Sequence, residues 1–153
     1  MLFRYLFILL VLLPIKAFAL IEVDITRGNL NPLPVAVSPL AIDKNSKENF
    51  KKILKKENLG SEISLIVENN LKQSGLFNPL NKDAFLQEPD IANLKPRFED
   101  WNLIKAQALV TGKVTFADDK LRVEFRLWDV LAGKEMMALA FTTVPSNWRK
   151  RLF

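Results

Sequence analysis

The segment 108–129, ALVTGKVTFADDKLRVEFRLWD, carries the clearest secondary-structure pattern of the chain. Its second half alternates apolar residues with Arg122, Glu124 and Arg126, which is typical of a strand with one buried and one solvated face. Its first half repeats the alternation more loosely. Asp118 and Asp119 lie between the halves and have side chains that form turns readily. The segment therefore predicts two antiparallel strands joined by a tight turn.

A lone hairpin is marginal in water, so further strands and a covering helix are expected. Residues 34–40, PVAVSPL, form a short apolar run between prolines and predict a central strand covered on both faces. Residues 135–144 predict a third antiparallel strand. Residues 61–74 predict the main helix, capped by Ser61 and ended by Gly75 in a left-handed conformation.

The remaining segments give weaker patterns. Residues 46–56 predict a basic amphipathic helix, 81–96 a surface loop, and 97–104 a short helix whose aromatic residues lie in the core. A last helix is expected to begin near Ser146. The sequence ends soon afterwards, so we expect Trp148 to have little to pack against.

Residues 1–19 have the pattern of a secretory signal peptide. Arg4 precedes an apolar run, and Ala17-Phe18-Ala19 fits a cleavage site after Ala19. The apolar run is too short for a membrane-spanning helix, and none is expected in the mature chain. The predicted organisation is a signal peptide (1–19), an N-terminal arm (20–33) and one domain (34–153). The 153-residue sequence contains no cysteine, so its core must hold the fold without disulfides.

The segment after the predicted cleavage site also alternates apolar and polar residues. Such a pattern fits an edge strand of the domain's own sheet, or a mobile arm that adds to the sheet edge of a partner protein. The candidate partner-binding residues are Leu20, Ile21, Glu22, Val23, Asp24, Ile25 and Thr26.

Residue types exclude several kinds of catalytic site. The chain has no histidine and no cysteine, which excludes Ser-His-Asp and Cys-His nucleophile systems and the usual zinc sets. The adjacent carboxylates Glu99-Asp100 and Asp118-Asp119 do not face each other across a cleft, and we interpret them as turn or solvated groups. No catalytic, cofactor-binding or metal-binding residue is predicted. The formal net charge of +5 is modest, and the basic segment 46–56 is interpreted as a solvated face rather than a nucleic-acid contact.

Several segments, taken in order, resemble one known family. They are SGLFNPL at 74–80, LVTGKV at 109–114 and LWD at 127–129, behind an export signal and the apolar run PVAVSPL. Together they resemble the N-terminal domain of TolB proteins, which are periplasmic members of the Tol–Pal envelope system. None of these segments is a catalytic motif.

The resemblance implies an α/β (α+β) fold. Its mixed sheet contains a three-strand antiparallel meander, with helices packed on one side, similar to the anticodon-binding domain of class II aminoacyl-tRNA synthetases. It also implies a non-enzymatic scaffold in the periplasm that links inner-membrane and outer-membrane components. In this family the mature N-terminal segment binds TolA, and a C-terminal β-propeller binds Pal.

The sequence departs from the family pattern after Ser146, where family members continue the helix and add the propeller. A Pal contact is therefore doubtful for this chain. Two alternatives to the scaffold role stay open at this point: a non-functional truncated fragment, and a nucleic-acid-binding module.

Overall fold

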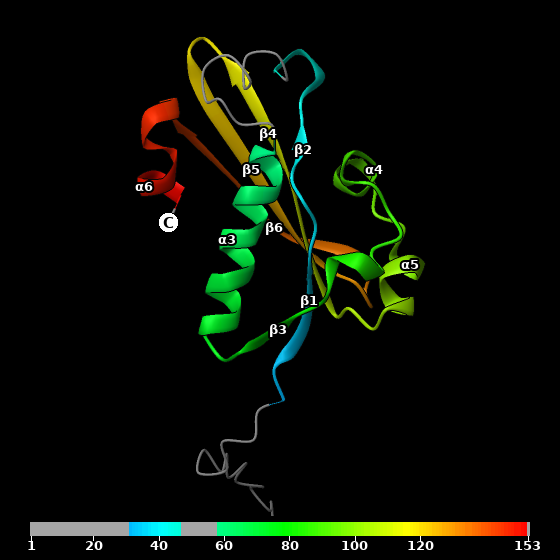
Figure 1. Cartoon of the computed structure of the whole chain (residues 1–153). Coiled ribbons are helices and arrows are strands. Elements are labelled where there is room, and N and C mark those ends of the chain that lie inside the picture. The colour runs from blue at the N-terminus through cyan, green and yellow to red at the C-terminus, as the bar shows by residue number, and fades with distance from the viewer. Residues whose placement is uncertain (1–30, 47–57, 153) are drawn as a thin grey trace, which may run out of the picture. The chain divides into compact units, whose positions relative to one another are not determined.

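The computed structural model describes residues 31–46 and 58–152. They form a six-stranded mixed sheet in the order β3-β1-β4-β5-β6, with β2 beside β4 (Figure 1). The strands are β1 (Leu33–Val37), β2 (Ala41–Ile42), β3 (Phe77–Pro79), β4 (Ala108–Ala117), β5 (Lys120–Asp129) and β6 (Lys134–Thr143). The helices are α3 (Leu59–Gln73), α4 (Pro89–Leu94), α5 (Phe98–Leu103) and α6 (Trp148–Leu152). The 3-10 turns are η1 (Lys44–Ser46), η2 (Lys82–Ala84) and η3 (Pro145–Asn147).

The predicted antiparallel meander is confirmed. Strands β4 and β5 pair along their whole length, and β6 follows antiparallel on the other side of β5. Asp118 and Asp119 have φ angles of 50° and 55°, as a two-residue type I′ turn requires. This turn matches the twist of the flanking strands, so local sequence alone is enough to fix the register of the hairpin.

The predicted central strand is also confirmed. Strand β1 lies between β3 and β4 and is parallel to both. Its residues Val35, Ala36 and Val37 are each at most 1% exposed, because helices cover both faces of the sheet here. An uninterrupted apolar run is what such a position needs.

Helix α3 confirms the prediction for 61–74, but the predicted cap is wrong. The helix begins two residues before Ser61, and its N-cap Asn58 makes no side-chain capping hydrogen bond. Ser61 lies inside the helix, where its carbonyl accepts a hydrogen bond from the Ser64 hydroxyl at 2.9 Å. Packing explains the earlier start, because Leu59 is fully buried. Gly75 has φ +72°, as predicted for the residue after the helix.

The first face of the sheet is covered by α3 and α6. Their apolar residues share a core cluster with strand residues, made of Leu40, Leu59, Ile63, Val114, Leu121, Val123 and Trp148. The expectation that Trp148 lacks packing partners was wrong, because its side chain is only 5% exposed. The 3-10 turn η3 folds the chain back from the end of β6, so that α6 lies beside the sheet (Figure 1) and Trp148, five residues after β6, packs in this cluster.

The second face of the sheet is covered by α4 and α5. Leu109 and Ala36 alternate with the residues that face α3, and they pack with Ala92 and Trp101. The prediction of a loop over 81–96 was therefore partly wrong, because α4 occupies 89–94. Pro89 at its first turn favours a helix start, although proline usually indicates a loop in a sequence.

The predicted fold class, a mixed sheet with an antiparallel three-strand meander and helices packed on one side, is confirmed, and the short helices α4 and α5 add a cover on the other face. The predicted short helix at 97–104 is confirmed as α5, with Trp101 1% exposed in the core. The predicted signal peptide and nearly all of the basic segment 46–56 lie outside the described residues. Within the described ranges, no helix is long and apolar enough to cross a membrane. The similarity to a tRNA-synthetase domain stays a prediction.

Candidate protein-interaction surfaces

The candidate residues Leu20, Ile21, Glu22, Val23, Asp24, Ile25 and Thr26 lie outside the described residues, so the structure does not place them. The described chain begins at Asn31, and residues 31–33 are exposed. From Leu33 on, backbone hydrogen bonds hold the chain in the sheet. Leu33 donates its N–H to the carbonyl of Leu76 at 2.9 Å, and Leu80 donates to the carbonyl of Val35 at 2.9 Å.

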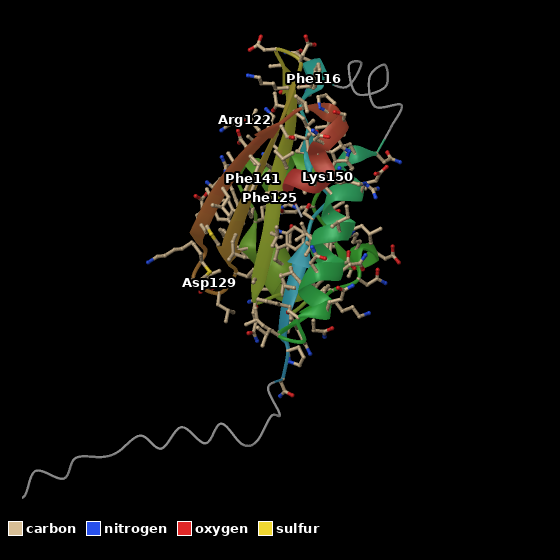
Figure 2. All side chains as sticks on the ribbon, turned by 90° about the vertical axis from the view of Figure 1, so that its left-hand side faces the viewer. Phe116, Arg122, Phe125, Asp129, Phe141 and Lys150 are labelled. Atoms are coloured by element: carbon tan, nitrogen blue, oxygen red, sulfur yellow. The ribbon has the colours of Figure 1, made fainter. Side chains whose placement is uncertain are left out.

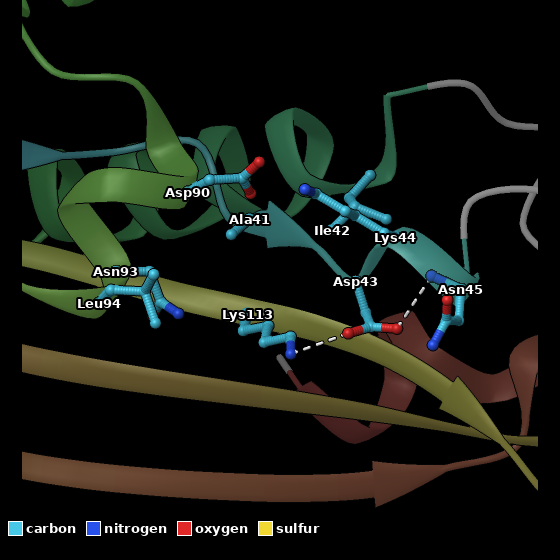
Figure 3. A pocket seen from close by; sticks show the side chains of 9 residues that line it. All are labelled: Ala41, Ile42, Asp43, Lys44, Asn45, Asp90, Asn93, Leu94 and Lys113. Carbon is cyan, nitrogen blue, oxygen red and sulfur yellow. Dashed lines mark hydrogen bonds and ion pairs between the residues drawn. The ribbon is translucent and has the colours of Figure 1, made fainter.

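A shallow pocket of about 460 Å³ lies between β2, η1, α4 and β4 (Figure 3). Its central feature is an ion pair, in which Lys113 Nζ lies 2.9 Å from Asp43 Oδ1. The other carboxylate oxygen of Asp43 accepts the backbone N–H of Asn45 at 3.2 Å. The lining residues are Ala41, Ile42, Asp43, Lys44, Asn45, Asp90, Asn93, Leu94 and Lys113.

The charged residues of this pocket have a structural role. The hydrogen bond from Lys113 is the main cause that lowers the pKa of Asp43 below its usual value of 3.8, and burial opposes the shift only in part. Ser46 completes the attachment, because its hydroxyl accepts the N–H of Phe116 at 2.9 Å. Together these contacts fasten η1 to β4. We interpret Asp43 and Lys113 as a structural pair rather than a reactive one.

The outer strand β6 presents a second surface (Figure 2). Eight of its ten residues, 134–140 and 142, are exposed, and Phe141 packs edge-to-face on Phe125 with ring centroids 6.2 Å apart. On the opposite face, Arg122 pairs with Glu124 at 2.7 Å, and Arg126 lies 3.6 Å from a carboxylate oxygen of Glu135. The sequence analysis predicted this strand but not its exposure. The sequence feature that could have indicated an unprotected edge strand is the uncharged run MMALAFTT at 136–143.

In the described part of the chain, no group of three or more acidic residues could hold a metal ion. Asp100, one of the adjacent carboxylates, accepts hydrogen bonds from Arg97 at 2.6 Å and from Gln87 at 3.2 Å, and the Arg97 contact is the main cause that lowers its pKa. These contacts give Asp100 a structural role at the start of α5.

Comparison with protein families gives a match over most of the chain. The model of the TolB amino-terminal domain matches residues 21–136. The chain is 87% identical over 150 residues to the Tol-Pal system protein TolB of Pelagibacter ubique (strain HTCC1062). This match covers 98% of the chain and 34% of the relative, so the chain spans about a third of that protein's length.

Solved structures agree with this match at the level of fold. TolB from Acinetobacter baumannii superposes with a TM-score of 0.55 and 20% identity, over 77% of this chain and 25% of that one. The LpoB C-terminal domain from Escherichia coli has a TM-score of 0.52 and 11% identity, over 76% of this chain and 85% of the domain. The family match and the 87% identical relative carry the assignment: this chain belongs to the TolB amino-terminal domain family.

Proposed function

We propose that this chain is a periplasmic, non-enzymatic interaction component of the Tol–Pal system, which helps to link inner-membrane and outer-membrane proteins. The observation that carries the proposal is the match of the TolB amino-terminal domain to residues 21–136, together with the 87% identical Tol-Pal system protein TolB. The matched region starts one residue after Leu20. It therefore includes nearly all of the segment 20–26 that the sequence analysis selected.

The proposed contact is strand addition by residues 20–26. Ile21, Val23 and Ile25 would lie on one face of an extended segment, and Glu22 and Asp24 on the other. In strand addition, backbone hydrogen bonds to an exposed sheet edge supply affinity, and alternate side chains supply specificity. The proposed partner is the periplasmic part of TolA.

The residue inventory supports a role in binding rather than catalysis. The sequence lacks histidine and cysteine, the commonest general base and the most nucleophilic side chain at neutral pH. The carboxylates with resolved pKa shifts, Asp43 and Asp100, are each held by a neighbouring cation. Both have lowered pKa values, whereas a general base at neutral pH needs a raised one.

A co-purification experiment tests the proposal. The chain beginning at Leu20 should retain the periplasmic domain of TolA, and the chain beginning at Asn29 should not. Val23→Asp should weaken retention, because a charge would replace an apolar contact. Asn31→Asp introduces the same charge at an exposed position outside the segment, so it is the matched control and should bind as the unchanged chain does. Equal binding by the chains that begin at Leu20 and Asn29 would overturn the role of the segment.

The location and the second partner are tested separately. Mass spectrometry of the protein from a periplasmic extract should give an N-terminus at Leu20. A protein that stays in the cytoplasm with Met1 attached would contradict the proposed location. Pal is expected not to be retained by this chain, and retention of Pal would move part of its binding site into this domain.

A further inference from the structure

The two edges of the sheet differ in a way that matters for association. Strand β3 at one edge is three residues long and ends with Pro79. Strand β6 at the other edge has ten residues, and no described strand pairs with its outer side. Edge strands expose a row of free backbone donors and acceptors, and proteins commonly protect them by short length, proline, charge or a covering segment. Strand β3 has two of these protections.

Most of β6 lacks them. Residues 137–143, MALAFTT, contain no charge, proline or glycine. The register shift in the pairing of β5 with β6 falls before Met137, so the rest of the strand pairs regularly. Figure 2 shows α6 lying over the face of the sheet, while β6 forms its outer margin. A long, regular and uncharged edge is the kind that accepts another strand.

We propose that two copies of this chain associate through β6, antiparallel and about a twofold axis at Leu139. The two sheets would then form one continuous sheet. In this register Leu139 faces Leu139 of the second copy, and Met137 faces Phe141 of the second copy. A twofold interface uses the same surface on both copies, so the strand must be complementary to itself.

The apolar face of β6 meets this requirement. Met137 and Leu139 are 47% and 48% exposed in the single chain, beside the half-buried Phe141. Their neighbours on β5 are Leu127, Phe125 and Val123. Pairing would therefore place apolar side chains of both copies in contact on one face. Burial of such side chains is the main favourable term in association.

The charged face selects the register. Glu124 lies beside Ala140, and Arg126 lies beside Ala138. With Leu139 on the axis, Ala138 faces Ala140 of the second copy. The row of side chains that runs across the strands through this pair therefore begins with Arg126 of one copy and ends with Glu124 of the other. A shift of two residues either way would align two Glu124 or two Arg126 side chains in one row. Like charges aligned across an interface are unfavourable, so the proposed register is favoured over both of these shifted registers.

Cysteine cross-linking tests both the pairing and the register, because the chain contains no cysteine. Directly paired antiparallel residues have Cα atoms about 4.5–5.5 Å apart, a distance that a disulfide spans. Leu139→Cys should therefore form a linked dimer under mild oxidation. Leu131→Cys, at a 72% exposed position outside β6, is the control and should stay monomeric.

A mixture of the Ala138→Cys and Ala140→Cys proteins should give the mixed dimer, and each protein alone should not link. Linkage of either protein alone would contradict the register. Sedimentation equilibrium of the unchanged protein should show a mass that rises with concentration towards twice the monomer value. Leu139→Lys should keep the circular dichroism spectrum and abolish this rise. A constant monomer mass, with Leu139→Cys unlinked, would overturn the proposal.

Discussion

Trp101 donates its indole N–H to the side-chain oxygen of Gln87 over 3.1 Å, inside the core between α5 and the sheet. Gln87 is 6% exposed and uses all of its polar atoms, because the same oxygen accepts the N–H of Arg97 and its amide donates to Asp100. One amide side chain therefore joins the segment before α4 to the start of α5. Buried polar groups are stable in a core only when their hydrogen bonds are made.

Replacement of Gln87 by leucine should destabilise the fold. The substitution leaves the indole N–H of Trp101 and the backbone N–H of Arg97 without their acceptor. Each of these two groups costs about 1–3 kcal/mol when it loses its partner, so we expect the free energy of unfolding to fall by about 2–6 kcal/mol. Urea denaturation measures it. Glu88→Gln, at the exposed neighbouring position, is the control, and an equal effect of both changes would contradict the proposed role.

Gly60 and Gly75 should respond differently to substitution by alanine. A Cβ at Gly60 would collide with the backbone carbonyl of Leu40, so α3 must move away from the sheet. Gly75 has φ +72° and open space around it, so alanine there costs only the left-handed conformation, about 1–2 kcal/mol. Gly60→Ala should therefore reduce the urea midpoint more than Gly75→Ala does. The reverse order would show that α3 does not pack as closely as described.

The sequence was sufficient wherever structure depends on neighbours in the chain. Alternation along β5, the turn residues Asp118 and Asp119, and the left-handed Gly75 are local signals, and each was predicted correctly. Features set by distant contacts were not. The start of α3 depends on burial of Leu59 against strands far along the chain, so the apparent cap Ser61 was misleading.

The candidate surfaces show the same division. The pocket forms because η1 and α4, which are separated by more than 40 residues, meet beside Lys113, and no sequence period encodes such a meeting. The exposure of β6 follows from the strand order, which depends on parallel pairing of β1 with β4. The family resemblance supplied what local patterns could not, since it rested on the order of several segments that are weak individually.

Substitutions in the turn at Asp118 and Asp119 should be able to increase the stability of the fold. Both residues have positive φ, which aspartate tolerates and glycine adopts at no steric cost. Asn-Gly is the preferred sequence for this type I′ turn, so Asp118→Asn with Asp119→Gly should raise the free energy of unfolding by up to ~1 kcal/mol. Asp118→Val with Asp119→Val is the contrasting change and should lower it. A melting temperature unchanged by either pair would show that the hairpin does not need this turn.

The Asp43–Lys113 pair should make stability depend on pH in the acid range. The pKa of Asp43 is lower in the folded chain, so its contribution is present above the unfolded value and is lost as the pH falls through the folded value. The unchanged protein should therefore be more stable than Asp43→Asn at neutral pH. This difference should shrink as the pH falls below 3.8. In the Lys113→Met background, Asp43→Asn should have a much smaller effect, and an undiminished effect would contradict the pairing.

The buried Trp148 leads to the last prediction, which concerns whether α6 is part of the folded unit. A short helix at the end of a sequence is expected to fray, because isolated helices below about 12 residues are marginal in water. Here tertiary packing replaces helix length, since Trp148 lies in the same cluster as Leu59, Val114 and Leu121. Trp148→Ala should therefore cost about 3–5 kcal/mol, as for other large-to-small changes in cores. Val144→Ala, at a 47% exposed position just before η3, should change stability by less than about 0.5 kcal/mol. If both variants unfold at the same urea concentration as the unchanged protein, α6 is detached in solution, and the apolar side chains beneath it are open to another occupant.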